Sequence, residues 1–227
     1  MGETASGRLT GARKEEEMEM RKRTMLLCVA AAFLAAPAAG DTFGWEDGAS
    51  TILGCSGNLI DEQNVDGPFV HTGARSLRVT EAPHSGTPQA WIAWITGIRD
   101  DDVVRAGFRA YDEWEDYPSL RLHAHYTPGT DFTIYMGDAF GPMEFSDPVG
   151  WDLLEGSWNI DTWEGEREGL VIEARLYSTP TECDSCATDF WIDDLYVDAP
   201  AHATVYFPLG PSATDNTSWG GVKNLFR

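Results

Sequence analysis

The sequence is poor in basic residues and in cysteine. Its 227 residues include 16 Lys and Arg against 37 Asp and Glu, a formal net charge of −21 at pH 7. Such a surface repels nucleic acids and anionic membranes, so we expect neither as a partner. Four cysteines are present. Three follow residue 40, so one thiol among Cys55, Cys183 and Cys186 is left over from any disulfide, and the pairing stays open.

Long apolar segments are missing as well. The apolar stretch 26–36 is too short to span a bilayer. It follows the basic triplet 21–23 and precedes the small residues at 38–40, an order typical of a secretory signal peptide. We therefore expect residues 1–40 to be a signal peptide and leader, and the protein to be secreted or held at the cell surface.

Amphipathic helical periodicity is absent after residue 40, where short β-rich segments alternate with turn clusters. This pattern predicts an all-β protein, an antiparallel sandwich of about eight or nine strands over residues 41–200. Residues 201–227 are expected to be a linker and short tail. The expected strands are 42–45, 76–80, 90–96, 103–111, 120–126, 132–135, 158–161, 170–177 and 190–197.

Strict alternation marks three of these strands. In residues 120–126, Leu and Ala alternate with Arg121, His123 and His125. Residues 170–177 and 103–111 alternate in the same way, with Arg175 and Arg109 on the polar side. Because successive strand side chains point to opposite faces, we expect each strand to present one apolar face to the core and one polar face outward.

Several motifs resemble the jelly-roll carbohydrate-binding modules within the galactose-binding-like β-sandwiches. They are FGWEDG at 43–48, HTGARSLRV at 71–79, Trp158 at the start of a later strand, and FWIDDL at 190–195. The likeness spans residues 42–199. It implies a jelly-roll fold and a non-catalytic domain that binds a glycan or polysaccharide.

The adjacent carboxylates Asp193 and Asp194 lie in an otherwise apolar strand, where alternation would point them to opposite faces. A buried, unpaired carboxylate is costly. The resemblance implies a structural Ca²⁺ that joins the first and last strands, with Glu46, Gly73, Ser76 and Asp193 at the matching positions. The alternative is that Asp193 accepts hydrogen bonds from backbone or Arg donors.

Glycan sites combine aromatic platforms with planar polar side chains. The candidate ligand-binding residues are Trp114, Arg109, Tyr111, Arg121, His123, His125 and Arg175. We expect Trp94, Trp114 and Trp163 to be exposed, and Trp91, Trp158 and Trp191 to belong to the core. The alternative is a solvated sheet face with cross-strand pairs such as Arg175 with Glu173.

The sequence contains no nucleophile elbow, phosphate loop or dinucleotide fingerprint. His123 and His125 share a face, but the Glu that follows such a pair in a cupin metal site is missing. We therefore predict a secreted, non-catalytic carbohydrate-binding β-sandwich with structural calcium. The alternatives are an adhesive or structural surface domain without a sugar site, and a polysaccharide-active enzyme on the same scaffold.

Overall fold

The computed structural model describes residues 40–82, 87–113, 119–142, 144–146, 149–177 and 188–208. Twelve strands lie in these ranges, and they form two sheets. Sheet A contains β1 (Asp41–Phe43), β3 (Leu59–Val65), β4 (Ser76–Glu81), β6 (Val103–Asp112), β9 (Gly150–Asn159) and β11 (Thr188–Asp198). Sheet B contains β2 (Gly54–Ser56), β5 (Gln89–Thr96), β7 (Ser119–Thr127), β8 (Asp138–Phe140), β10 (Gly169–Tyr177) and β12 (Thr204–Tyr206).

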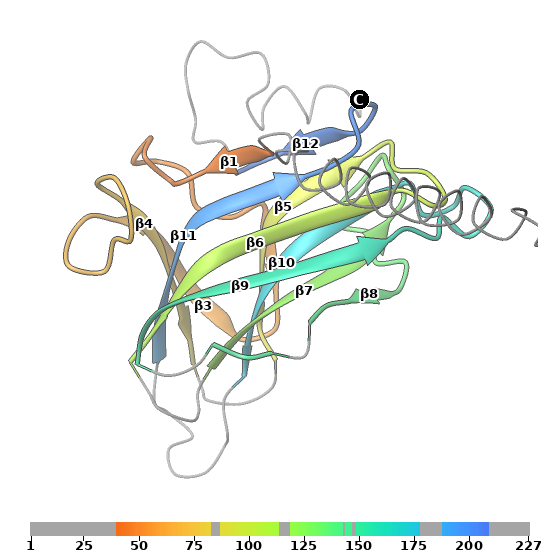
Figure 1. The fold of residues 1–227 in the computed structure, drawn as a ribbon. Helices are drawn as coiled ribbons and strands as arrows, with labels where there is room; N and C mark the ends of the chain where they lie inside the picture. Colours follow the sequence, from red (N-terminus) through yellow and green to blue (C-terminus); the bar gives the residue numbers. More distant parts are fainter. Residues whose placement is uncertain are drawn as a thin grey trace, which may run out of the picture. The chain divides into compact units, whose positions relative to one another are not determined.

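The two sheets pack face to face as an antiparallel β-sandwich (Figure 1). The strand order is β3-β4-β11-β6-β9 in sheet A, where β1 also pairs with β11. In sheet B it is β12-β5-β10-β7-β8, and β2 also pairs with β5. The expected all-β antiparallel sandwich is confirmed, with more strands than the eight or nine expected.

Strands β2, β3 and β8 lie where no strand was expected, and the expected segments differ from the structure in three further places. Residues 132–135 form a turn, because the Asp131 carboxylate accepts hydrogen bonds from the backbone and hydroxyl of Thr133 (2.8 and 2.7 Å). The strand expected at 158–161 is the end of the longer β9. In addition, β12 pairs with β5, so the sandwich continues into the segment expected to be a linker.

The expected leader lies outside the described residues except for Gly40, and so does the tail from residue 209. No helix within the described ranges is long and apolar enough to cross a membrane.

The core lies between the sheets and follows the alternation of the strands. Leu120, Leu122 and Ala124 of β7 are fully buried, as are the alternating apolar residues of β10 and β6. Phe108 and Phe190 are among the largest fully buried side chains. Burial of a large apolar side chain is worth roughly 1.5–3 kcal/mol, so this two-sided apolar layer is the main source of stability.

A β-bulge interrupts the alternation of β11. The pairing of β11 with β6 shifts register between Asp193 and Tyr196, and Asp194 has a φ of 48°. As a result Ile192 and Leu195, three positions apart, are both fully buried. The expectation that Asp193 and Asp194 point to opposite faces is wrong, because an extra residue in one strand re-aims the side chains beside it.

A second bulge lies in β5, where the register with β10 shifts between Ile172 and Glu173. Here Ile92 and Ala93 are neighbours in sequence, yet both are fully buried in the core. Trp91 and Trp94 consequently lie on the outer side of sheet B. Trp94 is buried there with Phe132 and Val171 in a separate apolar cluster. The expectations that Trp94 is exposed and that Trp91 is in the core are both wrong.

Candidate functional site

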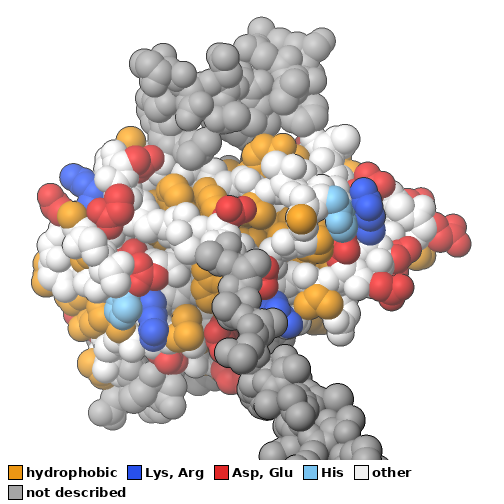
Figure 2. Space-filling view, turned by 45° about the horizontal axis from the view of Figure 1, so that its top comes forward, with side chains coloured by type: hydrophobic (Ala, Val, Ile, Leu, Met, Phe, Trp, Pro, Cys, Tyr) orange, Lys and Arg blue, Asp and Glu red, His pale blue; other side chains and the backbone are white. Residues whose placement is uncertain are grey.

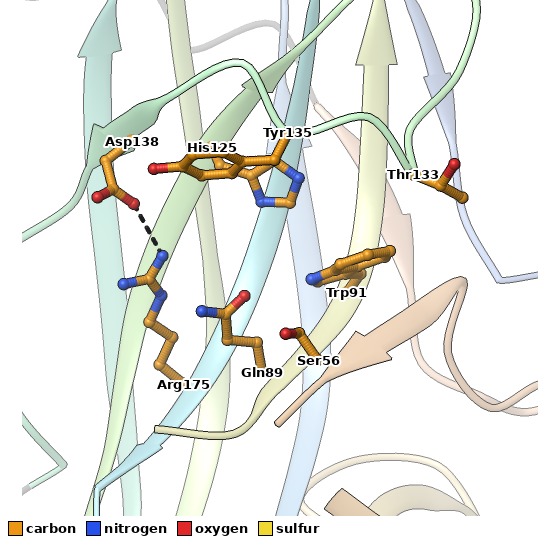
Figure 3. Close-up of a pocket in the computed structure, with 8 residues that line it drawn as sticks. All are labelled: Ser56, Gln89, Trp91, His125, Thr133, Tyr135, Asp138 and Arg175. Carbon is orange, nitrogen blue, oxygen red and sulfur yellow. Dashed lines mark hydrogen bonds and ion pairs between the residues drawn. The ribbon is translucent and has the colours of Figure 1, made fainter. Parts of the chain in front are cut away.

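A pocket of about 300 Å³ lies on the outer side of sheet B, between the strands and the segment that leads into β8 (Figure 3). Its size is at the lower end of the range for small-molecule sites, about 300–1,000 Å³. Strands β2, β5, β7, β8 and β10 and the 131–137 segment all contribute side chains. The pocket is lined by Ser56, Gln89, Trp91, His125, Thr133, Tyr135, Asp138 and Arg175.

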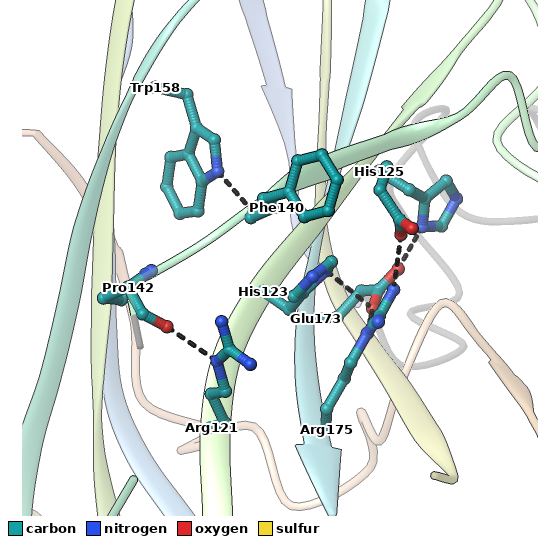
Figure 4. A network of polar contacts seen from close by, with 9 residues as sticks. Arg121, His123, His125, Phe140, Pro142, Trp158, Glu173 and Arg175 are labelled. Carbon is teal, nitrogen blue, oxygen red and sulfur yellow. Dashed lines mark hydrogen bonds and ion pairs between the residues drawn. The ribbon is translucent and has the colours of Figure 1, made fainter. Parts of the chain in front are cut away.

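A buried carboxylate, Glu173, organises the polar groups behind the pocket (Figure 4). It hydrogen-bonds His125 Nδ1 and accepts a 2.5 Å bond from Arg175 Nε. Burial alone would raise the pKa of Glu173, but the bonds from His125 and Arg175 outweigh it and hold that pKa below its usual range. Glu173 is therefore ionised, and it fixes both neighbouring side chains in place.

His123 and Arg121 continue this polar row along β7 beneath the 140–142 segment. Arg121 Nε donates a 2.7 Å hydrogen bond to the carbonyl oxygen of Pro142. His123 is 3 % exposed, and its Nδ1, 3.7 Å from Glu173 Oε2, has no hydrogen-bond partner in the described part of the chain. Burial, aided by the charge of Arg175, lowers the pKa of His123 to about 4. His123 is therefore neutral near pH 7.

The low pKa of His123 predicts acid sensitivity of the fold. In the unfolded chain a histidine titrates near pH 6.5, so between about pH 6.5 and 4 the unfolded state binds more protons. Stability attributable to His123 is complete above pH 6.5 and falls as pH drops, by about 3 kcal/mol at pH 4. Urea unfolding of wild type and His123→Gln at pH 7 and pH 4 measures this difference. Identical pH dependence of the two proteins would contradict it.

The pocket presents hydrogen-bonding groups and an aromatic surface together. The indole Nε1 of Trp91 is buried, has no hydrogen-bond partner among the residues that the structure describes, and points toward the interior of the pocket. The Tyr135 side chain is 59 % exposed at the rim, and the Gln89 amide lies across from it. The Trp91 indole N–H and the Gln89 amide can hydrogen-bond the hydroxyl groups of a ligand, and the exposed Tyr135 ring can stack on its C–H faces.

The structure brings together four of the seven sequence-predicted ligand residues. Arg121, His123, His125 and Arg175 lie side by side on β7 and β10. All four are largely covered by the segment around β8, which pairs with β7. The polar side of these strands is thus a buried network, and its open part is the pocket.

Arg109 and Tyr111 do not belong to this site. Both lie on β6 in sheet A, on the outer side opposite to that of sheet B. Tyr111 packs with Phe69, Trp151 and Trp191 at ring centroid distances of 4.9, 5.4 and 5.8 Å. The expectation of a single binding face is wrong, because β6 and β7 join different sheets. Trp114 lies outside the described residues.

Sequence reasoning missed six lining residues: Ser56, Gln89, Trp91, Thr133, Tyr135 and Asp138. The alternation of Gln89 and Trp91 with the buried Ala90 was a usable signal for those two. No comparable signal existed for Tyr135 and Asp138, since a turn and a short edge strand place them over β7.

The expected cation site lies at the other sheet, where Asp193 is fully buried. Its Oδ2 accepts hydrogen bonds from the backbone N–H groups of His71 and Thr72 (2.9 and 3.1 Å). The Glu46 carboxylate accepts bonds from the next N–H groups of the same loop, at Ala74 and Arg75 (3.1 and 3.4 Å). The loop of residues 71–75 therefore links Glu46, which follows β1, to Asp193 of β11.

Both carboxylates face one space. A Cβ added at Gly44 would lie 3.8 Å from Asp193 Oδ1 and 3.9 Å from Glu46 Oε1. Gly73 has a φ of 70°, and a Cβ there would collide with the Glu46 carboxylate. Ser76 is buried beneath the loop, with its hydroxyl donating to the Phe69 carbonyl oxygen (2.6 Å).

This donor set fits Ca²⁺, which takes carboxylate and carbonyl oxygens. Burial raises the pKa of Asp193, and its backbone hydrogen bonds only partly oppose this. In the described part of the chain no three His, Cys, Asp or Glu side chains are arranged to hold a metal ion. Calcium here would need backbone carbonyl oxygens beside Glu46 and Asp193.

Asp194 supports the same loop through side chains. Its carboxylate pairs with His71 Nδ1 at 2.5 Å and accepts a hydrogen bond from the Thr72 hydroxyl. The bulge in β11 thus lets both aspartates bind residues 71 and 72. Asp193 binds their backbone N–H groups, and Asp194 binds their side chains.

Acidic side chains outnumber basic ones in this chain. On the face drawn in Figure 2, acidic side chains are spread among hydrophobic ones and basic side chains are few. An anionic ligand would approach against this field, whereas neutral ligands and cations would not.

No protein-family model and no curated protein matches the chain. Solved structures with a similar strand arrangement include the two xylan-binding domains, CBM22-1 and CBM22-2, of Paenibacillus barcinonensis Xyn10C. They are 15 % and 18 % identical, cover 71 % and 70 % of this chain and 96 % and 99 % of their own, and have TM-scores of 0.47 and 0.49. The C-terminal family 22 carbohydrate-binding module of Clostridium thermocellum Xyn10B is 13 % identical over 74 % of this chain and 98 % of its own, with a TM-score of 0.45. These modules are β-sandwiches of the kind that the sequence motifs resemble.

Proposed function

We propose that this chain is a non-catalytic glycan-binding domain that acts outside the cell, and that the pocket on sheet B is its binding site. The observation that carries the proposal is the buried, unpartnered indole N–H of Trp91 facing a pocket rimmed by the exposed ring of Tyr135. A sugar hydroxyl supplies the missing acceptor, and a pyranose C–H face stacks on the tyrosine ring.

The carboxylates of the pocket support binding rather than hydrolysis. Glycoside hydrolysis uses two carboxyl groups on opposite sides of the scissile bond. Here Glu173 is fully buried, and Arg175 binds both Glu173 and Asp138, the latter at 3.0 Å. Neither carboxylate is placed as a free acid or nucleophile.

A structural Ca²⁺ is the second part of the proposal. Glu46 and Asp193 would hold it together with carbonyl oxygens of the 71–76 segment, and it would neutralise the buried Asp193 charge. Bound there, it supplies a crosslink between the start and the end of the sandwich. This role is structural, since the site lies on sheet A and the pocket lies on sheet B.

Glycan binding is tested with wild type, Trp91→Phe and Tyr135→Ala. The probes are xylohexaose, cellohexaose, mannohexaose and galactohexaose, and the measurement is isothermal titration calorimetry. The first probe is the class of glycan that the similar modules are described as binding. Loss of the indole donor is expected to weaken binding by roughly fivefold, and loss of the tyrosine ring by roughly tenfold.

Trp163→Ala is the matched control, because Trp163 is 57 % exposed but stacks on Arg167 outside the pocket (4.8 Å). Its affinity is expected to equal that of wild type. Absence of binding to any probe, or Tyr135→Ala binding as tightly as wild type, would overturn the proposal.

A further inference from the structure

The pocket contains an arginine that is already occupied. Arg175 is the only Lys or Arg among the described residues that line it. Its Nη2 donates to Asp138 at 3.0 Å (Figure 3), and its Nε donates to Glu173 at 2.5 Å. The guanidinium is mostly buried, with 12 % of the side chain exposed. An arginine elsewhere would be a natural partner for a ligand carboxylate, but here two of its nitrogens already bind carboxylates of the protein.

The charges around this arginine place one carboxylate at the opening of the pocket. Of the charged side chains that line the pocket, Asp138 and Arg175 balance each other, and Glu173 lies buried behind them. Asp138 is the member of this set that reaches the solvent side, with 35 % of its side chain exposed. A ligand carboxylate in the pocket would therefore meet Asp138 before it could reach Arg175. Like charges at such short range repel, and little water screens them in a partly enclosed site.

We propose that Asp138 determines the specificity of the pocket: it holds Arg175 away from the ligand, so that the pocket takes neutral glycans and rejects glycans built from uronic acids. The inference rests on the proposed function, since it concerns which sugars enter the same pocket. It assigns to Asp138 a role in selection rather than in attraction, because its main effect is on the sugars that are excluded.

Two pairs of probes with matched linkage and length test the proposal: galactohexaose with hexagalacturonate, and mannohexaose with hexamannuronate. Wild type is expected to bind at least one neutral member and its uronate partner at least tenfold more weakly. In Asp138→Asn the amide oxygen still accepts from Arg175, but one negative charge is gone. The uronate affinity is expected to rise about tenfold, while the neutral affinity changes less than threefold.

Asp198→Asn is the control for net charge. Asp198 also pairs with an arginine, Arg105 at 3.5 Å, but it lies on sheet A. This variant should leave both affinities unchanged. Circular dichroism confirms folding, and if Asp138→Asn does not fold, Asp138→Ser takes its place, because it removes the same charge with a smaller side chain.

The outcomes separate the two proposals. If folded wild type binds neither neutral nor uronate probes, the proposed function fails and the selectivity fails with it. If wild type binds glycans but takes the uronates as tightly as the neutral partners, glycan binding stands and the role of Asp138 is overturned. The role of Asp138 is also overturned if Asp138→Asn binds uronates no more tightly than wild type does. It is overturned as well if Asp198→Asn gains as much uronate affinity as Asp138→Asn.

Discussion

Replacement of Glu173 by alanine is expected to lower the free energy of unfolding by about 3–5 kcal/mol, because it breaks a buried ion pair by removing one partner. Arg175 would lose its 2.5 Å acceptor, and the buried His125 would lose its only hydrogen-bond partner among the described residues. Glu173→Gln keeps the shape and one acceptor, so we expect a smaller loss of about 1–3 kcal/mol. Urea unfolding followed by tryptophan fluorescence gives these values.

An exposed ion pair provides the comparison. Asp198 pairs with Arg105, whose side chain is 61 % exposed, so Asp198→Ala should cost less than about 1 kcal/mol. If Glu173→Ala were as stable as Asp198→Ala, the polar network behind the pocket would be a surface feature rather than a part of the fold. Loss of glycan affinity in Glu173→Gln would in addition show that the network behind the pocket maintains the shape of the binding site.

Replacement of Asp193 by alanine is the second large effect. The variant leaves the backbone N–H groups of His71, Thr72 and Asp194 without their acceptor. The three hydrogen bonds are partly buried and end on a charged acceptor. Such bonds are worth about 1.5–3 kcal/mol each, so the sum is about 3 kcal/mol or more. For a domain of this size that corresponds to a fall in melting temperature of roughly 6–12 °C.

The same variant tests the calcium proposal. The melting temperature of wild type is expected to rise when EDTA is replaced by excess Ca²⁺, since a cation bound only to the folded state stabilises it. Asp193→Ala should show no such rise. Asp194→Ala is the matched control, because its carboxylate binds only the side chains of His71 and Thr72 and should leave the response intact.

Equal melting temperatures of wild type in EDTA and in Ca²⁺ would end the calcium proposal. In that case the backbone hydrogen bonds alone would offset the cost of burying the Asp193 carboxylate. Unchanged stability of Asp193→Ala would contradict the hydrogen-bond account as well.

The polar row on β7 and β10 was predictable because it depends on local geometry. Alternation places Arg121, His123 and His125 on one face whatever the rest of the fold does. Arg109 and Tyr111 obey the same rule on β6, yet they end up on the other side of the sandwich. The pattern within a strand says which residues share a face, but it does not say which sheet the strand joins.

The bulges in β5 and β11 were beyond the reach of the pattern. Each is a mismatch between a strand and its partner, so it exists only once the two are paired. The bulge in β5 puts Trp94 on the same outer side as Trp91, and the bulge in β11 turns both aspartates toward one loop. Adjacent aspartates in the sequence could equally have faced opposite sides.

The sequence by itself determined the all-β class, the apolar faces of the long strands and the polar row beside the pocket, since each follows from side chains that are near neighbours in the chain. Only the tertiary structure decided that β7 pairs with β10 and that β6 lies in the opposite sheet. It also decided that the 131–142 segment covers His123 and places Tyr135 and Asp138 over the strands. These arrangements join residues far apart in the chain, and their energies come from packing and pairing that no local pattern records.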